Sequence, residues 1–215
     1  MKNLNLIILL LIVQSSFAQS PADELLNNLL KKINQTGKYQ VDINIQIDVK
    51  FIKIKNRTGK MFFTPPDSVR FKIDGFAFLP KKGFNSQLNS LKNQKVTALS
   101  MGQEKLNGLN CEVIKVIPSD IGSELVLAQI WLDPIKNRMI KMTTITKSQG
   151  SSTIAFDYAV QNKYDLPSKM KVSFEIKNQK LPVSFTGDFE QIEDQIKPGV
   201  DQGSVIITYS NFVFQ

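Results

Sequence analysis

The stretch from Tyr39 to Phe51 alternates apolar and polar side chains without interruption, and this pattern restricts the fold more than any other feature. Its apolar members are Tyr39, Val41, Ile43, Ile45, Ile47, Val49 and Phe51. Only a β-strand places every second residue on one face, so the segment predicts a strand with one apolar and one polar face. The apolar positions then shift to Ile52 and Ile54, which predicts a β-bulge, and so long a strand requires a curved, twisted sheet.

Shorter alternating segments continue to the C-terminus. They predict strands over residues 60–64, 69–73, 112–117, 126–132, 140–144, 154–158, 170–176 and 204–214. Turn signals separate them at 56–59, Asp74-Gly75, Asn107-Gly108 and Asp133-Pro134, and Pro65-Pro66 stops another strand. In the strand at 126–132, the residues expected on one face are Val126, Ala128, Ile130 and Leu132. The spacing predicts one antiparallel meander of about ten strands.

A single amphipathic helix is predicted before the first strand, over residues 21–36. Ser20 can cap its free N–H groups, and Pro21 suits the first helical position. Gly37 is a stop signal. The apolar stripe at helical spacing comprises Leu25, Leu26, Leu29, Leu30 and Ile33. This stripe fits either a mobile lid or a permanently docked helix.

Two segments depart from the alternation. Residues 80–95 are polar and basic, and they fit a short amphipathic helix or a plain loop. Their lysines Lys81, Lys82, Lys92 and Lys95 suit anionic head groups or a solvated loop. Residues 186–203 are acidic and contain glycine, which predicts a long loop.

The predicted fold is mainly β (α+β), because about ten strands share one helix. The apolar face of the sheet must be covered, and one helix cannot cover a flat sheet of this width. A curved antiparallel sheet that forms an incomplete β-barrel, with the N-terminal helix as a lid, meets this requirement. Its concave interior is either filled by side chains or open as a site for an apolar ligand.

Residues 1–18 read as a removable secretory signal. Lys2 precedes a short apolar run, and Ser16 and Ala18 are the small residues of a cleavage site between Ala18 and Gln19. The alternative is an uncleaved anchor, although the apolar run is short for a membrane span. The mature protein is then expected to be a single domain, residues 19–215, in the periplasm, or secreted as a second choice.

Composition excludes much catalytic chemistry. The sequence has no histidine and one cysteine, so it has no Ser-His-Asp triad, histidine-ligated metal or internal disulfide. Cys111 fits a buried structural role better than a reactive one. Asp120, Glu124 and Asp201 match no calcium loop. Trp131 has the opposite parity to its neighbours and is expected to pack on the outer surface or at an interface. No cofactor, metal or enzymatic activity is expected.

The net charge of +8 at pH 7 favours either anionic surfaces or simple solubility. Nucleic acid is not an expected partner, because the chain carries an export signal and no tight basic cluster. We expect a monomer that makes transient contact with a membrane surface.

Several short motifs occur in a recognisable order. They are Gly59-Lys60-Met61-Phe62-Phe63-Thr64-Pro65-Pro66-Asp67-Ser68-Val69-Arg70-Phe71, then Leu109-Asn110-Cys111-Glu112-Val113, Ile130-Trp131-Leu132-Asp133-Pro134 and Leu166-Pro167-Ser168-Lys169. With the signal, the lone helix and the long strand, this order resembles the LolA-like family. That family comprises the periplasmic outer-membrane lipoprotein carriers and lipoprotein-sorting proteins of bacteria.

The resemblance implies a half-barrel that holds acyl chains of lipoproteins or other lipids, works with partner proteins of the inner or outer membrane, and catalyses nothing. A sensor or protein-interaction module with a filled core is the alternative. The family's dedicated carrier has an arginine where this chain has Thr64, which places the carrier's release cycle in doubt. The candidate cavity-facing residues are Leu25, Leu29, Val41, Ile43, Ile45, Ile47, Phe71, Ile73, Ile130, Leu132, Met142, Ile154, Phe156 and Phe174.

Overall fold

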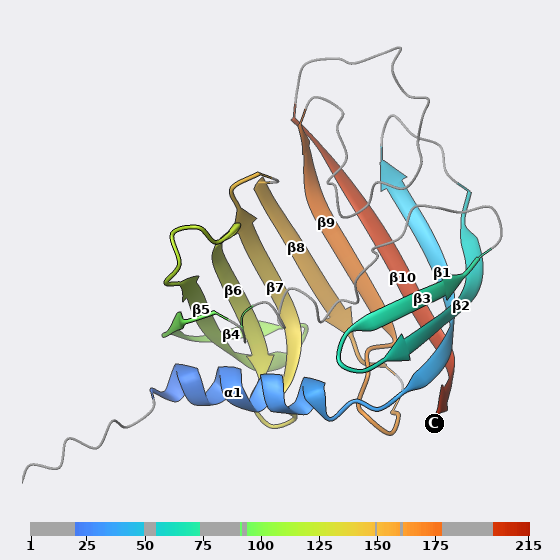
Figure 1. Cartoon of the computed structure of the whole chain (residues 1–215), viewed down its shortest axis with the longest axis horizontal. Coiled ribbons are helices and arrows are strands. Elements are labelled where there is room, and N and C mark those ends of the chain that lie inside the picture. The colour runs from blue at the N-terminus through green and yellow to red at the C-terminus, as the bar shows by residue number, and fades with distance from the viewer. Residues whose placement is uncertain are drawn as a thin grey trace, which may run out of the picture.

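The computed structural model describes residues 20–49, 55–73, 91, 94–148, 150–159, 161–177 and 200–215. Within these residues, one helix lies across one side of a single antiparallel sheet that curves without closing into a barrel (Figure 1). The elements are α1 (Pro21–Asn34), β1 (Tyr39–Val49), β2 (Arg57–Thr64), β3 (Ser68–Lys72), β4 (Val96–Leu106), β5 (Leu109–Pro118), β6 (Leu125–Asp133), β7 (Arg138–Thr146), β8 (Gly150–Asp157), β9 (Lys169–Lys177) and β10 (Val200–Phe214).

The strand order is β3-β2-β1-β10-β9-β8-β7-β6-β5-β4. Two meanders, β1–β3 and β4–β10, are therefore joined through the pairing of β1 with β10, in which Ile45 lies opposite Ile207. The predicted antiparallel meander is correct within each of these two parts. A single meander is wrong, because β3 and β4 follow one another among the described strands but form opposite edges of the sheet.

The predicted boundaries differ from the observed ones at several points. The Ser20 hydroxyl accepts a hydrogen bond from the Asp23 amide at 3.1 Å, as expected of a cap, but α1 ends at Asn34 rather than at residue 36. Strand β2 begins at Arg57, inside the predicted turn, because Arg57 pairs with Ile45 of β1. Strand β10 begins at Val200, inside the predicted loop. Strand β4 was not predicted at all.

Other predictions fall outside the described residues. These are the leader at 1–18, the bulge at Ile52 and Ile54, the Asp74-Gly75 turn, nearly all of the segment 80–95, and residues 186–199. No helix among the described residues is both long enough and apolar enough to span a bilayer.

The core lies on the concave side of the sheet. Alternate residues of β1 point into it: Val41, Ile43 and Ile45 are only 1–3% exposed. Residue 126 is an exception to the predicted parity, because the β6–β7 register shifts between Leu125 and Leu127. Val126 is therefore 45% exposed, and Leu125 packs against the core instead.

A second, small apolar cluster lies apart from this core. It comprises Cys111, Val113, Trp131 and Ile140. The Trp131 indole N–H donates to the Glu104 carboxylate at 2.7 Å, and the Lys141 ammonium lies 4.0 Å from its ring centroid. Trp131 therefore packs away from the concave face, as its parity predicts. Cys111 is fully buried, and burial raises the pKa of its thiol.

Candidate functional site

The concave face forms one continuous apolar surface that runs from β2 and β3 through the centre of the sheet to β4. All the predicted cavity-facing residues belong to it or pack against it. The partly buried ones are Leu25, Ile47, Phe71 and Ile73, and the buried ones are Leu29, Val41, Ile43, Ile45, Ile130, Leu132, Met142, Ile154, Phe156 and Phe174. The structure thus brings together side chains from six strands and the helix on one face.

Aromatic residues that sequence reasoning did not select extend this face at the β1–β10 side. Tyr39 stacks on Phe63 with ring centroids 5.1 Å apart, and Tyr164 meets Phe214 edge-on at 5.2 Å. Tyr209 is 5% exposed, and burial raises the pKa of its phenol. Tyr39 belongs to the alternating stretch that predicted the first strand, and Phe63 lies in the predicted strand 60–64. Both residues would have been selected if aromatic positions in these strands had been counted as part of the apolar face.

Helix α1 covers one end of the concave face. Leu26, Leu29 and Leu30 are buried and belong to the same core, and the helix packs against β4 and β7 (Figure 1). The amphipathic stripe is therefore docked on the sheet in this structure. It lies against β4 and β7, so the predicted helical lid covers this end of the face.

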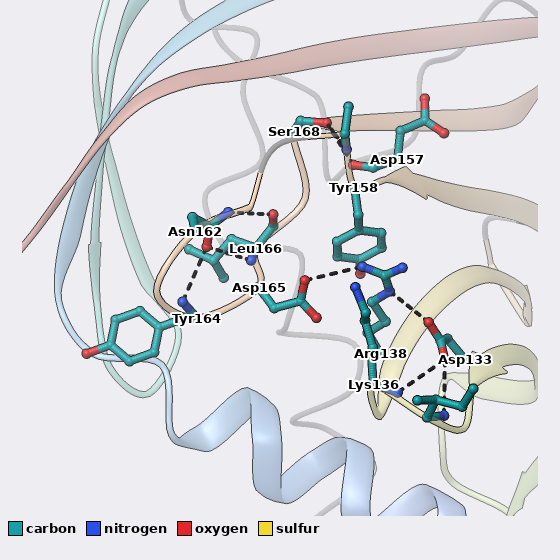
Figure 2. A network of polar contacts seen from close by, with 12 residues as sticks. Asp133, Lys136, Arg138, Asp157, Tyr158, Asn162, Tyr164, Asp165, Leu166 and Ser168 are labelled. Carbon is teal, nitrogen blue, oxygen red and sulfur yellow. Dashed lines mark hydrogen bonds and ion pairs between the residues drawn. The ribbon is translucent and has the colours of Figure 1, made fainter.

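A charged network links α1 to two connections between strands, and Figure 2 shows its part around Arg138. The Arg138 guanidinium contacts the Asp133 carboxylate at 3.1 Å and the Asp165 carboxylate at 3.2 Å. The Arg138 guanidinium carbon also lies 4.4 Å from the centroid of the Tyr158 ring. Lys32 of α1 reaches the other oxygen of Asp165 at 2.9 Å. The network thus connects the helix, the β6–β7 turn and the β8–β9 loop.

The β8–β9 loop is shaped around Asn162, as Figure 2 shows. Its side-chain oxygen accepts from the Leu166 amide at 2.8 Å, and its side-chain nitrogen donates to the Leu166 carbonyl at 2.8 Å. Ser168 then donates to the Asp157 carbonyl at 3.1 Å and accepts from the Ala159 amide at 3.0 Å. These bonds hold Asp165, which has a positive φ of 53°, in reach of Lys32 and Arg138.

A groove of about 550 Å³ opens between α1 and β4. Its lining residues are Leu26, Asn27, Leu30, Lys31, Asn34, Gln35, Leu91, Gln94 and Val96. Val41, Ile43 and Ile45 are not among the residues that line this groove. The groove was not predicted, because it depends on β4 and on the docking of α1 against it.

No protein-family model matches the chain, and no curated protein matches it either. Solved structures with the same architecture do match. An outer membrane lipoprotein-sorting protein domain, so described, from Vibrio parahaemolyticus aligns with a TM-score of 0.55 at 14% identity, over 90% of this chain and 93% of its own. A LolA superfamily protein from Nitrosomonas europaea aligns with a TM-score of 0.55 at 10% identity over the same shares. The fold is LolA-like.

A DUF1329 family protein from Desulfovibrio piger also aligns, with a TM-score of 0.51 at 12% identity over 91% of this chain and 93% of its own. Identities this low show the fold alone. The LolA-like resemblance inferred from the motifs is thus confirmed for the fold. At the position where the family's carrier has an arginine, Thr64 is exposed at the end of β2 and pairs with Ser68.

The acidic residues Asp120 and Glu124 accept hydrogen bonds within turns. Asp120 accepts from the Gly122 amide at 2.8 Å, and Glu124 accepts from the Ser148 amide at 2.8 Å. The Ser148 bonds hold the pKa of Glu124 below its usual value. Within the described residues, His, Cys, Asp and Glu side chains form no group of three that could hold a metal ion.

Proposed function

We propose that this protein binds acyl chains of lipoproteins or other lipids between the concave face of the sheet and α1. The observation that carries the proposal is the single apolar surface that spans the curved, unclosed sheet and continues under the helix. Transfer of an acyl chain from water to such a surface is driven by apolar area, at about 25 cal/mol per Å². The LolA-like fold supports this role, since one similar structure is described as a lipoprotein-sorting domain.

The proposal includes no catalytic step. An acyl ligand requires an apolar binding surface and an entrance to it. Convergent polar groups are required only around its head group. We propose further that residues 1–18 direct the chain to the periplasm, that residues 19–215 act as one monomeric domain, and that proteins of the inner or outer membrane deliver or receive the ligand. Secretion is the second choice of location.

A filled core is the alternative, and one observation favours it. Ile45 is 1% exposed and Val41 is 1% exposed, so the centre of the face is closed to solvent in this structure. Under this alternative the protein is a sensor or interaction module that meets its partner on its surface. Acyl binding instead requires α1 or another cover to move aside when ligand enters.

Titration with fatty acids of increasing length separates the two functions. Each additional buried methylene contributes about 0.8 kcal/mol, so affinity should rise about fourfold per carbon. The measurement is displacement of a fluorescent acyl probe from the purified protein. Affinity that does not change with chain length would contradict the acyl-binding function and support the filled core.

Two neighbouring residues of β4 provide matched variants for this titration. Ala98 is 6% exposed and faces the core, whereas Thr97 is exposed on the other face. Ala98→Leu should fill interior space and weaken acyl binding, while Thr97→Leu should leave binding unchanged. Overpacking costs about 1–3 kcal/mol of stability, so thermal unfolding of Ala98→Leu must show that it stays folded.

A further inference from the structure

We propose that the groove between α1 and β4 binds the anionic head group of an acyl lipid, with Lys31 as its charged contact. This inference rests on the proposed function and adds to it the chemistry of the ligand's head and the place where the chain enters. A volume of about 550 Å³ lies within the range of about 300–1,000 Å³ usual for ligand sites.

The floor of the groove belongs to the core itself. Leu26, Leu30 and Leu91 are 4%, 8% and 2% exposed and are members of the cluster that includes the concave face. Val96 packs against the same cluster. An acyl chain that starts in this groove would therefore meet apolar side chains from the groove to the interior of the sheet, once a displacement of α1 opens the packing between them.

The rim of the groove is polar and carries positive charge. Asn27, Lys31 and Asn34 recur at i, i+4 and i+7 and so share one face of α1. Lys31 is exposed and has no ion-pair partner within the described part of the chain, in contrast to the adjacent Lys32, which is paired with Asp165. Among the described residues that line the groove, none carries a carboxylate. This charge distribution fits an anionic head and disfavours a cationic one.

Gln94 supplies a second donor on the opposite side. Its side-chain oxygen accepts a hydrogen bond from the Ser123 hydroxyl at 3.1 Å, and Ser123 is 6% exposed. With the oxygen engaged, the amide nitrogen is the group left for a ligand, and it can only donate. Lys31 and Gln94 thus offer donors, which suits a carboxylate or a phosphate.

The test compares ligands that share one acyl chain and differ in the head. Tetradecanoate, tetradecyl phosphate, tetradecanol and tetradecyltrimethylammonium are each used to displace a fluorescent acyl probe from the purified protein. The two anions should bind about fivefold more tightly than the alcohol, the scale expected for an exposed charged contact. A preference between the two anions identifies the head as a carboxylate or a phosphate.

Variants assign the preference to the groove. Lys31→Met should remove most of the difference between anion and alcohol and leave the affinity for the alcohol unchanged. Lys38→Met, at an exposed lysine beyond α1, should behave like the wild type. Ser123→Ala should reduce the preference by about twofold, because Gln94 loses the bond that orients its amide.

The possible failures are distinct. If the alcohol and the anions bind equally in the wild type, or if Lys31→Met keeps the preference, the head-group site is wrong while acyl binding stands. If none of the ligands displaces the probe and the probe itself does not bind, the proposed function fails and the inference fails with it.

Discussion

The Nζ atom of Lys32 lies 2.9 Å from a carboxylate oxygen of Asp165, which joins the last turn of α1 to the loop between β8 and β9. The other oxygen of Asp165 contacts Arg138, so the helix is tied into the network at the end of the sheet. A motion that lifts the last turn of α1 off the sheet to admit a ligand would break or stretch the Lys32–Asp165 pair. The pair would then contribute part of the free energy needed to open the interior.

Lys32→Met should loosen α1 without altering the sheet. The paired side chains are 29% and 27% exposed, so the pair contributes only about 0.5–1 kcal/mol. Hydrogen exchange of the α1 amides should then quicken by about twofold to fivefold, read by mass spectrometry. Lys60→Met removes an ion pair with Asp42 between β1 and β2 and serves as the control. Unchanged exchange in α1 would show that Lys32 does not hold the helix.

Arg138→Met should destabilise the protein far more. The Arg138 and Asp133 side chains are 10% and 9% exposed, and removing one partner of a buried pair costs about 3 kcal/mol or more. Asp133 would keep its hydrogen bonds from the amides of Ile135 and Lys136, so the loss of stability should lie near the lower end of this range. Urea unfolding measures the effect.

An exposed arginine gives the matched control for that variant. The Arg70 guanidinium carbon lies 5.2 Å from the centroid of the Phe62 ring, and Arg70 is exposed, so Arg70→Met should cost less than about 1 kcal/mol. Equal stabilities of the Arg138 and Arg70 variants would contradict a structural role for the network.

Gly59→Ala should destabilise the β2–β3 hairpin. A Cβ atom at Gly59 would lie 2.4 Å from Cγ1 of Ile73 and 2.5 Å from the carbonyl oxygen of Lys72. We expect a loss of about 1–3 kcal/mol in urea unfolding. Because the Lys72 contact is with backbone, adding Ile73→Ala should restore only part of the stability. Thr58→Ala, at an exposed neighbour, should change little, and a neutral Gly59→Ala would refute the close approach.

Cys111 should make stability depend on pH in the alkaline range. Burial raises the pKa of its thiol above the ordinary value of 9.0, so the unfolded chain releases the proton first. The thiol's contribution is complete below the ordinary pKa, and the free energy of unfolding falls as pH rises above it. Cys111→Ala should flatten the part of this decline that begins near pH 9, about one unit below the ordinary pKa at which tyrosines of the unfolded chain ionise. An identical decline in both proteins would contradict the assignment.

The sequence predicted the faces of the sheet well because burial on one side leaves an alternating pattern. It failed for β4 because only Ala98 is buried there and most of the strand is exposed at an edge. The register shift that exposes Val126 left no local sign either. Strands β1 and β10 pair although they are far apart in the sequence. The periodicity of each strand alone cannot reveal such a pairing.

The polar part of the candidate site was also beyond sequence reasoning. Lys32 and Asp165 are 133 residues apart, and each alone resembles an ordinary surface charge. Only the fold brings them to Arg138. The rim of the groove is a similar case, since Gln94 and Lys31 line the same groove only because α1 docks beside β4. The apolar face was predictable, whereas the groups that would hold the helix and the ligand's head were not.

Native mass spectrometry of the mature protein, purified from its export compartment without detergent, tests acyl binding most directly. If the protein binds acyl chains, its mass should exceed that of the bare chain by an acyl lipid or lipopeptide, which organic extraction removes and which returns on incubation with the extracted lipid. A protein that is folded, bare as purified, and still bare after incubation with acylated peptides and fatty acids would contradict it.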